Sequence, residues 1–211
     1  MSDHSTPLSD RFLEALAFAH RVHGSDTRKG TAIPYVAHLL SVCGTVLADG
    51  GDEDEAIAAL LHDTLEDHAD TVSREELRNR FGDRVLGLVE LCTDTPADYR
   101  GGAKPPWRQR KTAYLEHLRR APAADLRISV ADKLDNTRAA LADYRELGEA
   151  LWARYNAGRE AQLWYFRSLV DGFRHAGVRG RLIDELDRVV SELERLAAAG
   201  RSPRPVSGTL P

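Results

Sequence analysis

Apolar residues recur three and four positions apart along most of the chain, and strict alternation of apolar and polar residues is nearly absent. The first spacing places apolar side chains on one face of a helix, whereas alternation is typical of a half-buried strand. In the segment after Ser9, a suitable N-cap, one face carries Phe12, Leu16 and Val22. The pattern therefore predicts an all-α protein.

Capping residues, glycines and prolines divide this pattern into about eight to ten helices. Asp52 and Glu55 have the spacing of a capping box, and so do Ser73 and Glu76. Pro34 suits the first turn of a helix, where its missing N–H costs nothing. The predicted helices cover about residues 9–23, 35–47, 52–68, 73–81, 83–92, 107–120, 123–144, 151–176 and 179–199.

Three segments fall outside the helical pattern. Residues 93–106 contain three prolines and two glycines, so we expect a long loop, and loops of this length in compact domains are often functional. The end of the chain, residues 200–211, is rich in proline and glycine and is expected to be disordered, while residues 1–8 are expected to be flexible.

Composition and charge narrow the class of protein. The 211 residues are 42% hydrophobic and 29% charged, which suits one hydrophobic core, and the net charge of −4 argues against general nucleic-acid binding. The sequence shows no secretory signal pattern and no apolar run of bilayer length. We therefore expect neither secretion nor a membrane-spanning helix, and we predict a cytoplasmic protein. Cys43 and Cys92 lie in apolar stretches without CxxC spacing, as expected for buried thiols.

The segment with the clearest chemistry is the predicted helix over 52–68. It carries His62 and Asp63 side by side, with Glu66 and Asp67 one turn later. On a continuous helix these side chains form adjoining stripes. Burying their charges without a compensating cation would cost on the order of several kcal/mol. A divalent metal ion would supply that charge, although an isolated His-Asp pair is more often structural.

Two further residues can complete a set of metal ligands. His38 lies on the predicted helix over 35–47, and Asp132 lies on the one over 123–144. Two imidazoles and two carboxylates suit Mn²⁺, Fe²⁺ or Zn²⁺ with positions left for water. Such an ion activates water and polarises phosphoryl oxygens, so the chemistry it favours is hydrolysis of a phosphate ester or anhydride.

The order of these residues along the chain resembles that of the HD-domain metal-dependent phosphohydrolases. The stretches RKGTAIPYVAH, AALLHDTLED and VADKLDN are similar to motifs of the hydrolase domain of the RelA/SpoT family, over roughly residues 10–176. With no room for a synthetase domain, the chain resembles the small alarmone hydrolases, including the metazoan SpoT homologue. The resemblance implies a single HD-type helical domain over 9–176. The apolar stripe that follows predicts an amphipathic helix over 177–199 that packs on the domain or on a partner.

The resemblance also implies residue roles. It makes one Mn²⁺ the cofactor and assigns the attacking water to two acidic residues. It places a basic pair, a tyrosine and an asparagine near the nucleotide, with a second tyrosine near the base. The implied ligands are His38, His62, Asp63 and Asp132, the water-handling residues are Glu66 and Asp67, and the substrate contacts are Arg28, Lys29, Tyr35, Asn136 and Tyr165.

The implied activity is Mn²⁺-dependent removal of the 3′-diphosphate of ppGpp or pppGpp, giving GDP or GTP and pyrophosphate. An HD-type hydrolase acting on another nucleotide, such as an adenosine alarmone, a 5′-nucleotide or NADPH, remains an alternative. A third hypothesis is a binding module that senses a nucleotide without hydrolysing it. The apolar stripe of the last helix leaves a homo-oligomer open.

Overall fold

The computed structural model describes residues 7–96 and 98–200, and within them it is built from ten α-helices and two short 3₁₀ helices, with one isolated β-bridge between Thr27 and Pro34. The all-α prediction is confirmed. The expectations for residues 1–6 and 201–211 lie outside the described residues. The helices are α1 (Asp10–His23), α2 (Val36–Ala48), α3 (Glu53–Leu61), α4 (Thr64–Asp67), α5 (Arg74–Phe81), α6 (Asp83–Cys92), α7 (Trp107–Arg120), η1 (Ala123–Asp125), α8 (Arg127–Leu147), η2 (Gly148–Arg154), α9 (Gly158–His175) and α10 (Arg181–Ala198).

Side-chain caps explain why several helices begin where the sequence predicts. The Ser9 hydroxyl accepts a hydrogen bond from the backbone N–H of Arg11 at 3.2 Å. Asp52 and Glu55 form a complete capping box, with both side-chain-to-backbone distances at 3.0 Å. These contacts satisfy N–H groups that would otherwise lack a partner at the start of α1 and α3.

The prediction of a single helix over 52–68 is wrong, because the structure divides this segment into α3 and α4 at His62 and Asp63. The His62 ring donates a hydrogen bond from Nδ1 to the carbonyl oxygen of Ala59 at 2.8 Å. A side chain thus engages a carbonyl that serves the helical ladder in a continuous helix, and α3 ends there. The interruption falls on two of the predicted ligands.

A second helix boundary also differs from the prediction. The helix predicted over 151–176 begins only at Gly158, and the preceding residues form the 3₁₀ helix η2. Gly158 has φ of +72°, a left-handed conformation that glycine adopts without strain and that separates the two elements. In the same way α8 is preceded by the short η1 instead of running on from Ala123.

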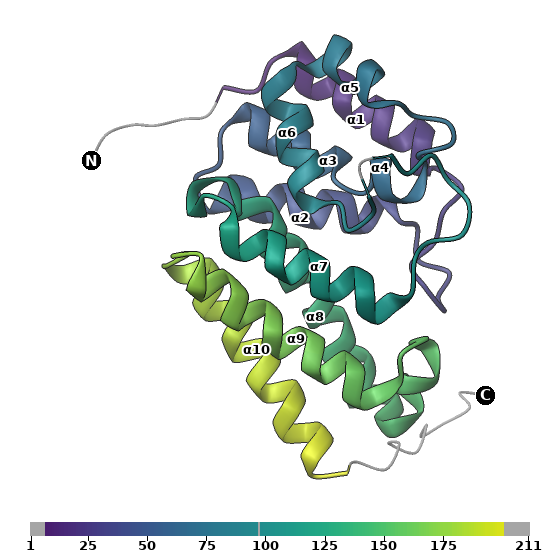
Figure 1. The fold of residues 1–211 in the computed structure, drawn as a ribbon, viewed down its shortest axis with the longest axis vertical. Coiled ribbons are helices and arrows are strands. Elements are labelled where there is room, and N and C mark those ends of the chain that lie inside the picture. Colours follow the sequence, from purple (N-terminus) through teal and green to yellow (C-terminus); the bar gives the residue numbers. More distant parts are fainter. Residues whose placement is uncertain (1–6, 97, 201–211) are drawn as a thin grey trace, which may run out of the picture.

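The helices enclose two hydrophobic clusters that share α8. The first lies among α1, α2, α3, α5 and α6, in the upper part of Figure 1, and the second lies among α7, α9, α10 and α8 below it. Ile128 and Ala131 of α8 belong to the first cluster, whereas Val130 and Leu134 belong to the second. Because α8 faces both clusters, a polar side chain on it is held between the two parts of the molecule.

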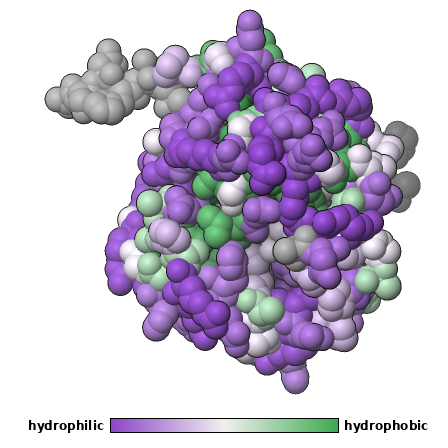
Figure 2. Space-filling view, turned by 45° about the horizontal axis from the view of Figure 1, so that its top comes forward, coloured by the Kyte–Doolittle hydropathy of each residue, from purple (hydrophilic) through white to green (hydrophobic). Residues whose placement is uncertain are grey.

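The last helix covers the second cluster. α10 packs against α8 and α9, and Leu186, Val190 and Leu193 are fully buried there. Hydrophilic residues predominate on the face seen in Figure 2, and hydrophobic residues show in smaller patches, one of them near its middle. Of the helices described, none combines the length and apolar character needed to cross a membrane. Cys43 and Cys92 are buried free thiols, as predicted.

Candidate functional site

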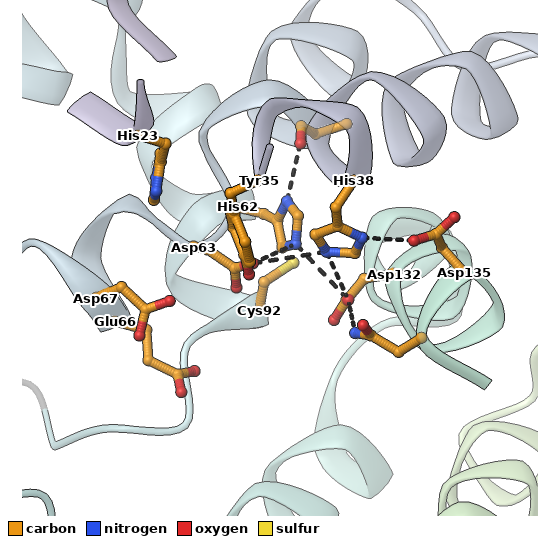
Figure 3. A network of polar contacts seen from close by, with 12 residues as sticks. His23, Tyr35, His38, His62, Asp63, Glu66, Asp67, Cys92, Asp132 and Asp135 are labelled. Carbon is orange, nitrogen blue, oxygen red and sulfur yellow. Dashed lines mark hydrogen bonds and ion pairs between the residues drawn. The ribbon is translucent and has the colours of Figure 1, made fainter. Parts of the chain in front are cut away.

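Three segments distant in sequence bring His38, His62 and Asp132 together. His38 lies in the first turn of α2, His62 follows α3 as its C-cap, and Asp132 lies on α8. One donor atom from each lies within 4.8 Å of the other two, and all three residues are buried. The Oδ1 atom of Asp132 lies 3.3 Å from His38 Nε2 and 3.7 Å from His62 Nε2 (Figure 3).

Hydrogen bonds on the far side of each ring determine which nitrogen faces this group. The Nδ1 atom of His62 donates to the Ala59 carbonyl, and Nδ1 of His38 donates to Asp135 Oδ2 at 2.6 Å. Because both partners can only accept, Nδ1 of each ring carries a hydrogen, and Nε2 is the ring atom that faces the group. Among the described residues, neither Nε2 atom has a hydrogen-bond partner.

Asp63 lies beside these three residues. Its Oδ2 atom is 3.0 Å from His62 Nε2 and 3.6 Å from His38 Nε2. The Tyr35 hydroxyl donates a hydrogen bond to the same oxygen and orients the carboxylate. The Nε2 atoms of His38 and His62 thus face the carboxylates of Asp63 and Asp132.

The carboxylates shift the titration of both rings. Burial opposes a charge on His38, but Asp132, Asp135 and Asp63 outweigh it and raise the pKa of His38 to about 9. The pKa of His62 is likewise raised well above its usual range, against burial, by Asp63 and Asp132. When no ion is bound, protons on the two rings therefore supply the positive charge that balances these buried carboxylates.

The donor set fits a divalent metal ion. Bonds of about 2.0–2.2 Å to one ion separate neighbouring donor atoms by about 3 to 3.5 Å, which is close to the distances between these nitrogens and oxygens. The two buried Nε2 atoms lack hydrogen-bond partners among the described residues and face carboxylate oxygens of Asp132 and Asp63, and a cation that displaces the ring protons would pair with these donors. The predicted ligands His38, His62 and Asp132 lie close enough together to hold one ion. Asp63 lies beside them, with Oδ2 3.0 Å from His62 Nε2.

Glu66 and Asp67 lie on α4, on the Asp63 side of this group (Figure 3). Lys104 from the loop before α7 pairs with both, at 3.1 Å from Glu66 Oε1 and 2.8 Å from Asp67 Oδ1. The Glu66 side chain is 18% exposed and that of Asp67 is 42% exposed. Burial, aided by the charge of Asp94, raises the pKa of Glu66, whereas Lys111 and Lys104 oppose the shift.

A cavity of about 310 Å³ opens next to the group, between α8, α9 and the loop before α2. All five predicted substrate contacts line it, although they come from three separate segments of the chain. They are Arg28, Lys29, Tyr35, Asn136 and Tyr165. The structure therefore brings them together beside the predicted metal ligands, joined through Tyr35 and Asn136, whose Nδ2 donates to Asp132.

Sequence reasoning missed Asp135. Its carboxylate accepts hydrogen bonds from His38 Nδ1 at 2.6 Å, Arg28 Nη1 at 2.8 Å and Ser41 Oγ at 2.5 Å. The second nitrogen of the Arg28 fork donates to Asn136 Oδ1 at 3.1 Å. Asp135 thereby connects an imidazole of the group to an arginine of the cavity. The only sequence signal is its position three residues after Asp132, on the same helix face.

Further basic residues of the cavity were also missed. Lys133 pairs with Asp132 Oδ2 at 2.5 Å, and both Lys133 and Lys111 line the cavity. Lys111 also pairs with Asp94 at 2.6 Å, as does Arg110. Lys111 and Arg110 belong to a basic run around α7 for which the sequence identifies no particular member, since helical periodicity cannot show which of them face inward. Lys133 lies on α8.

Comparisons with known proteins show which family this chain matches. A family model described as HD domain matches residues 15–161. The guanosine-3′,5′-bis(diphosphate) 3′-pyrophosphohydrolase MESH1 of Xenopus tropicalis is 36% identical over 129 residues, which cover 60% of this chain and 67% of that protein. The human MESH1 protein is 36% identical over 132 residues, covering 61% and 68% of the two chains.

A bacterial relative and a solved structure extend the comparison. The guanosine-3′,5′-bis(diphosphate) 3′-pyrophosphohydrolase of Aquifex aeolicus is 36% identical over 133 residues, or 62% of this chain, which spans only 18% of that longer protein. The structure of a metazoan ortholog of SpoT that hydrolyzes ppGpp is similar with a TM-score of 0.72 and 27% identity, covering 89% of this chain and 98% of that one.

Proposed function

Since this chain belongs to the HD domain family, we propose that it is a Mn²⁺-dependent hydrolase that removes the 3′-diphosphate from ppGpp and pppGpp. The observation that carries the proposal is the pair of buried Nε2 atoms facing Asp63 and Asp132 beside a basic cavity. The similarity to pyrophosphohydrolases of ppGpp supports the choice of substrate.

In the proposed reaction a water oxygen bonds to the phosphorus on the ribose 3′-oxygen, and the bond from that phosphorus to the ribose oxygen breaks. Pyrophosphate leaves with the new oxygen, and the ribose oxygen takes up a proton. His38, His62, Asp63 and Asp132 would hold the ion, which when bound lowers the pKa of water and polarises a phosphoryl oxygen.

Glu66 is the better placed of the two acidic residues to accept the proton of the attacking water. Burial raises the pKa of Glu66 and so strengthens its carboxylate as a base, while Lys104 holds it in place at 3.1 Å. Asp67 is more exposed and shares Lys104, so we assign it a positioning role. Mn²⁺ is proposed because a mixed nitrogen and oxygen donor set suits it.

The cavity would bind the nucleotide through charge and stacking. Arg28 presents a guanidinium fork, and Lys29, Lys111 and Lys133 add ammonium groups suited to a polyphosphate. Tyr165, buried at the cavity wall, offers a ring for contact with the base or ribose. Asn136 lies between the ligand Asp132 and Arg28, within reach of a ribose hydroxyl.

The test is hydrolysis of ppGpp by the purified full chain loaded with Mn²⁺. We expect stoichiometric GDP and pyrophosphate, with no product from protein stripped of metal. Absence of pyrophosphate from a folded chain that holds Mn²⁺ would contradict the proposal.

A substrate panel tests the specificity. We expect kcat/KM for ppGpp and pppGpp to exceed that for an adenosine alarmone, GTP and NADPH. Faster hydrolysis of one of the others would keep the chemistry and replace the substrate. Binding of ppGpp without turnover in the presence of bound Mn²⁺ would instead indicate a nucleotide sensor.

A further inference from the structure

A second group of imidazole and carboxylate side chains lies where α1 ends. His23 is the last residue of α1, Asp26 lies in the following loop, and His68 follows α4. Asp26 Oδ2 lies 2.9 Å from His23 Nδ1 and 2.7 Å from His68 Nε2. One donor atom from each residue lies within 4.8 Å of the other two, as in the first group.

The backbone on both sides holds these residues in place. The N–H of Asp26 donates to the carbonyl of His23 at 3.0 Å, and the carbonyl of Asp26 accepts from the N–H of Tyr35 at 2.9 Å. The N–H of His68 donates to the carbonyl of Thr64 at 3.0 Å. Since the chain is already ordered here, binding of a ligand requires little further loss of conformational entropy.

The group is closed on one side and open on the other. The His23 side chain is 0% exposed, whereas the side chains of Asp26 and His68 are 33% and 22% exposed. Asp26 and His68 line a cavity of about 430 Å³ together with Ser25, Thr27, Tyr35 and Asp67. This cavity provides a route of entry and space for several water molecules.

We propose that His23, Asp26 and His68 form a second binding site for a divalent cation with borderline ligand preference, of the class of Zn²⁺, Mn²⁺ or Co²⁺. Two nitrogens and one oxygen suit these ions, and three protein ligands leave positions for water in the cavity. Binding requires the ring hydrogens that now face Asp26 to move to the other ring nitrogens. In His23 that atom is Nε2, which has no hydrogen-bond partner among the described residues.

The second site is separated from the first by Tyr35. The Tyr35 ring stacks on His23 with centroids 5.3 Å apart, and its hydroxyl donates to Asp63. The loop that carries Arg28 and Lys29 runs between Asp26 and Tyr35, so an ion at the second site would fix one end of it. If the proposed function holds, occupancy of the second site lowers KM for the nucleotide more than it changes kcat.

Metal content separates the two sites. The full chain is stripped with a chelator, dialysed against Mn²⁺ or Co²⁺, and analysed for bound ions by elemental analysis. We expect two ions per chain in the wild type and one in Asp26→Asn and His68→Asn. His62→Asn, which removes a ligand of the first site, should also keep one, and its double variant with Asp26→Asn should keep none. His20→Asn, an exposed histidine of α1, is the matched control and should keep two.

The outcomes distinguish this proposal from the proposed function. One ion in the wild type that is lost in His62→Asn but retained in Asp26→Asn would overturn the second site and leave the first intact. One ion lost in Asp26→Asn but retained in His62→Asn would support the second site and contradict the first. The visible spectrum of bound Co²⁺ gives a readout independent of folding, because the Asp26→Asn variant should lose one set of bands while its circular dichroism is unchanged.

Discussion

The predicted metal centre and the adjoining cavity differ in how the chain builds them. His38, His62 and Asp132 of the centre lie on or at the ends of α2, α3 and α8 and are almost fully buried, and hydrogen bonds on their far sides orient the two rings. The cavity draws on the loop before α2 and on the faces of α7, α8 and α9, and its charged groups pair with one another. The centre is therefore rigid before any ligand arrives, whereas the cavity must exchange internal ion pairs for contacts with a nucleotide.

This difference separates two kinds of energetic cost. A buried imidazole facing carboxylates has no alternative partner, so loss of one ligand leaves the others unpaired. An arginine at the cavity has water and neighbouring carboxylates as substitutes, so its loss weakens binding by less. Substitutions in the centre should therefore abolish the chemistry, and substitutions in the cavity should mainly raise KM.

The largest effect is expected for the ligands. His62→Asn and Asp132→Asn should each lower kcat by at least about 10³-fold, since loss of the ion removes both activation of water and stabilisation of charge, each worth about 10²-fold or more. Turnover of ppGpp and metal content should be measured on the same preparation. Full activity in a variant without bound ion would show that hydrolysis does not need the metal and would contradict the proposed role of the ligands.

Glu66→Gln should come next, with a fall in kcat of about 10²–10⁴-fold and little change in metal content, because the amide cannot accept the proton. Asp67→Asn is its matched control on the same helix and should lose about 10-fold or less. Single-turnover kinetics measure the chemical step in each. A larger loss in Asp67→Asn than in Glu66→Gln would reverse the assigned roles.

Asp135→Asn tests the connection between the two regions. Because Asp135 orients His38 and increases its basicity, the variant should bind Mn²⁺ about 10–100-fold more weakly, as is usual when a carboxylate behind a metal-bound histidine is removed. Calorimetric titration measures the affinity. Asp187→Asn, on the far side of the molecule in α10, should leave it unchanged. Equal affinity in wild type and Asp135→Asn would assign Asp135 to Arg28 alone.

Arg28→Ala should raise KM for ppGpp by about 10- to 100-fold with a small change in kcat, corresponding to loss of one charged hydrogen-bonding group worth about 1.5–3 kcal/mol. Arg138→Ala, which removes a pair with Glu185 outside the cavity, is the control. Steady-state kinetics over a range of ppGpp concentrations distinguish the two constants. A fall in kcat alone would show that Arg28 acts on the reacting groups and not in binding of the nucleotide.

The smallest effect concerns the stability of the metal-free chain. His38 has a pKa of about 9 when folded and about 6.5 when unfolded, so its contribution is complete below pH 6.5 and disappears as the pH rises to 9. The loss is about 3 kcal/mol, or roughly 6–12 °C in Tm. Thermal unfolding of stripped protein should show this decline, and saturation with Mn²⁺ should remove it. A flat profile in the stripped protein would contradict the raised pKa.

The sequence predicted which residues cluster better than it predicted their setting. Helical spacing and capping residues located most helices, and the order His38, His62, Asp63, Asp132 selected a group that the fold brings together. The same spacing predicted a continuous helix through His62. It failed there because the break depends on a hydrogen bond from the ring to Ala59, which periodicity does not describe.

The residues that sequence reasoning missed depend on long-range packing. Lys104 meets Glu66 across 38 residues of sequence, and Asp135 meets Arg28 across 107. Neither pair has a local pattern, because the partners are brought together by the packing of segments that are distant in sequence. His68 and Asp26 are separated by 42 residues and are a further example.

The most direct test of the account is a crystal structure of the chain grown with Mn²⁺, with anomalous diffraction recorded to locate the ion. The account predicts a peak within about 2.0–2.3 Å of the Nε2 atoms of His38 and His62 and of carboxylate oxygens from Asp63 and Asp132. A fully formed fold with no peak among these atoms at saturating Mn²⁺ would contradict it.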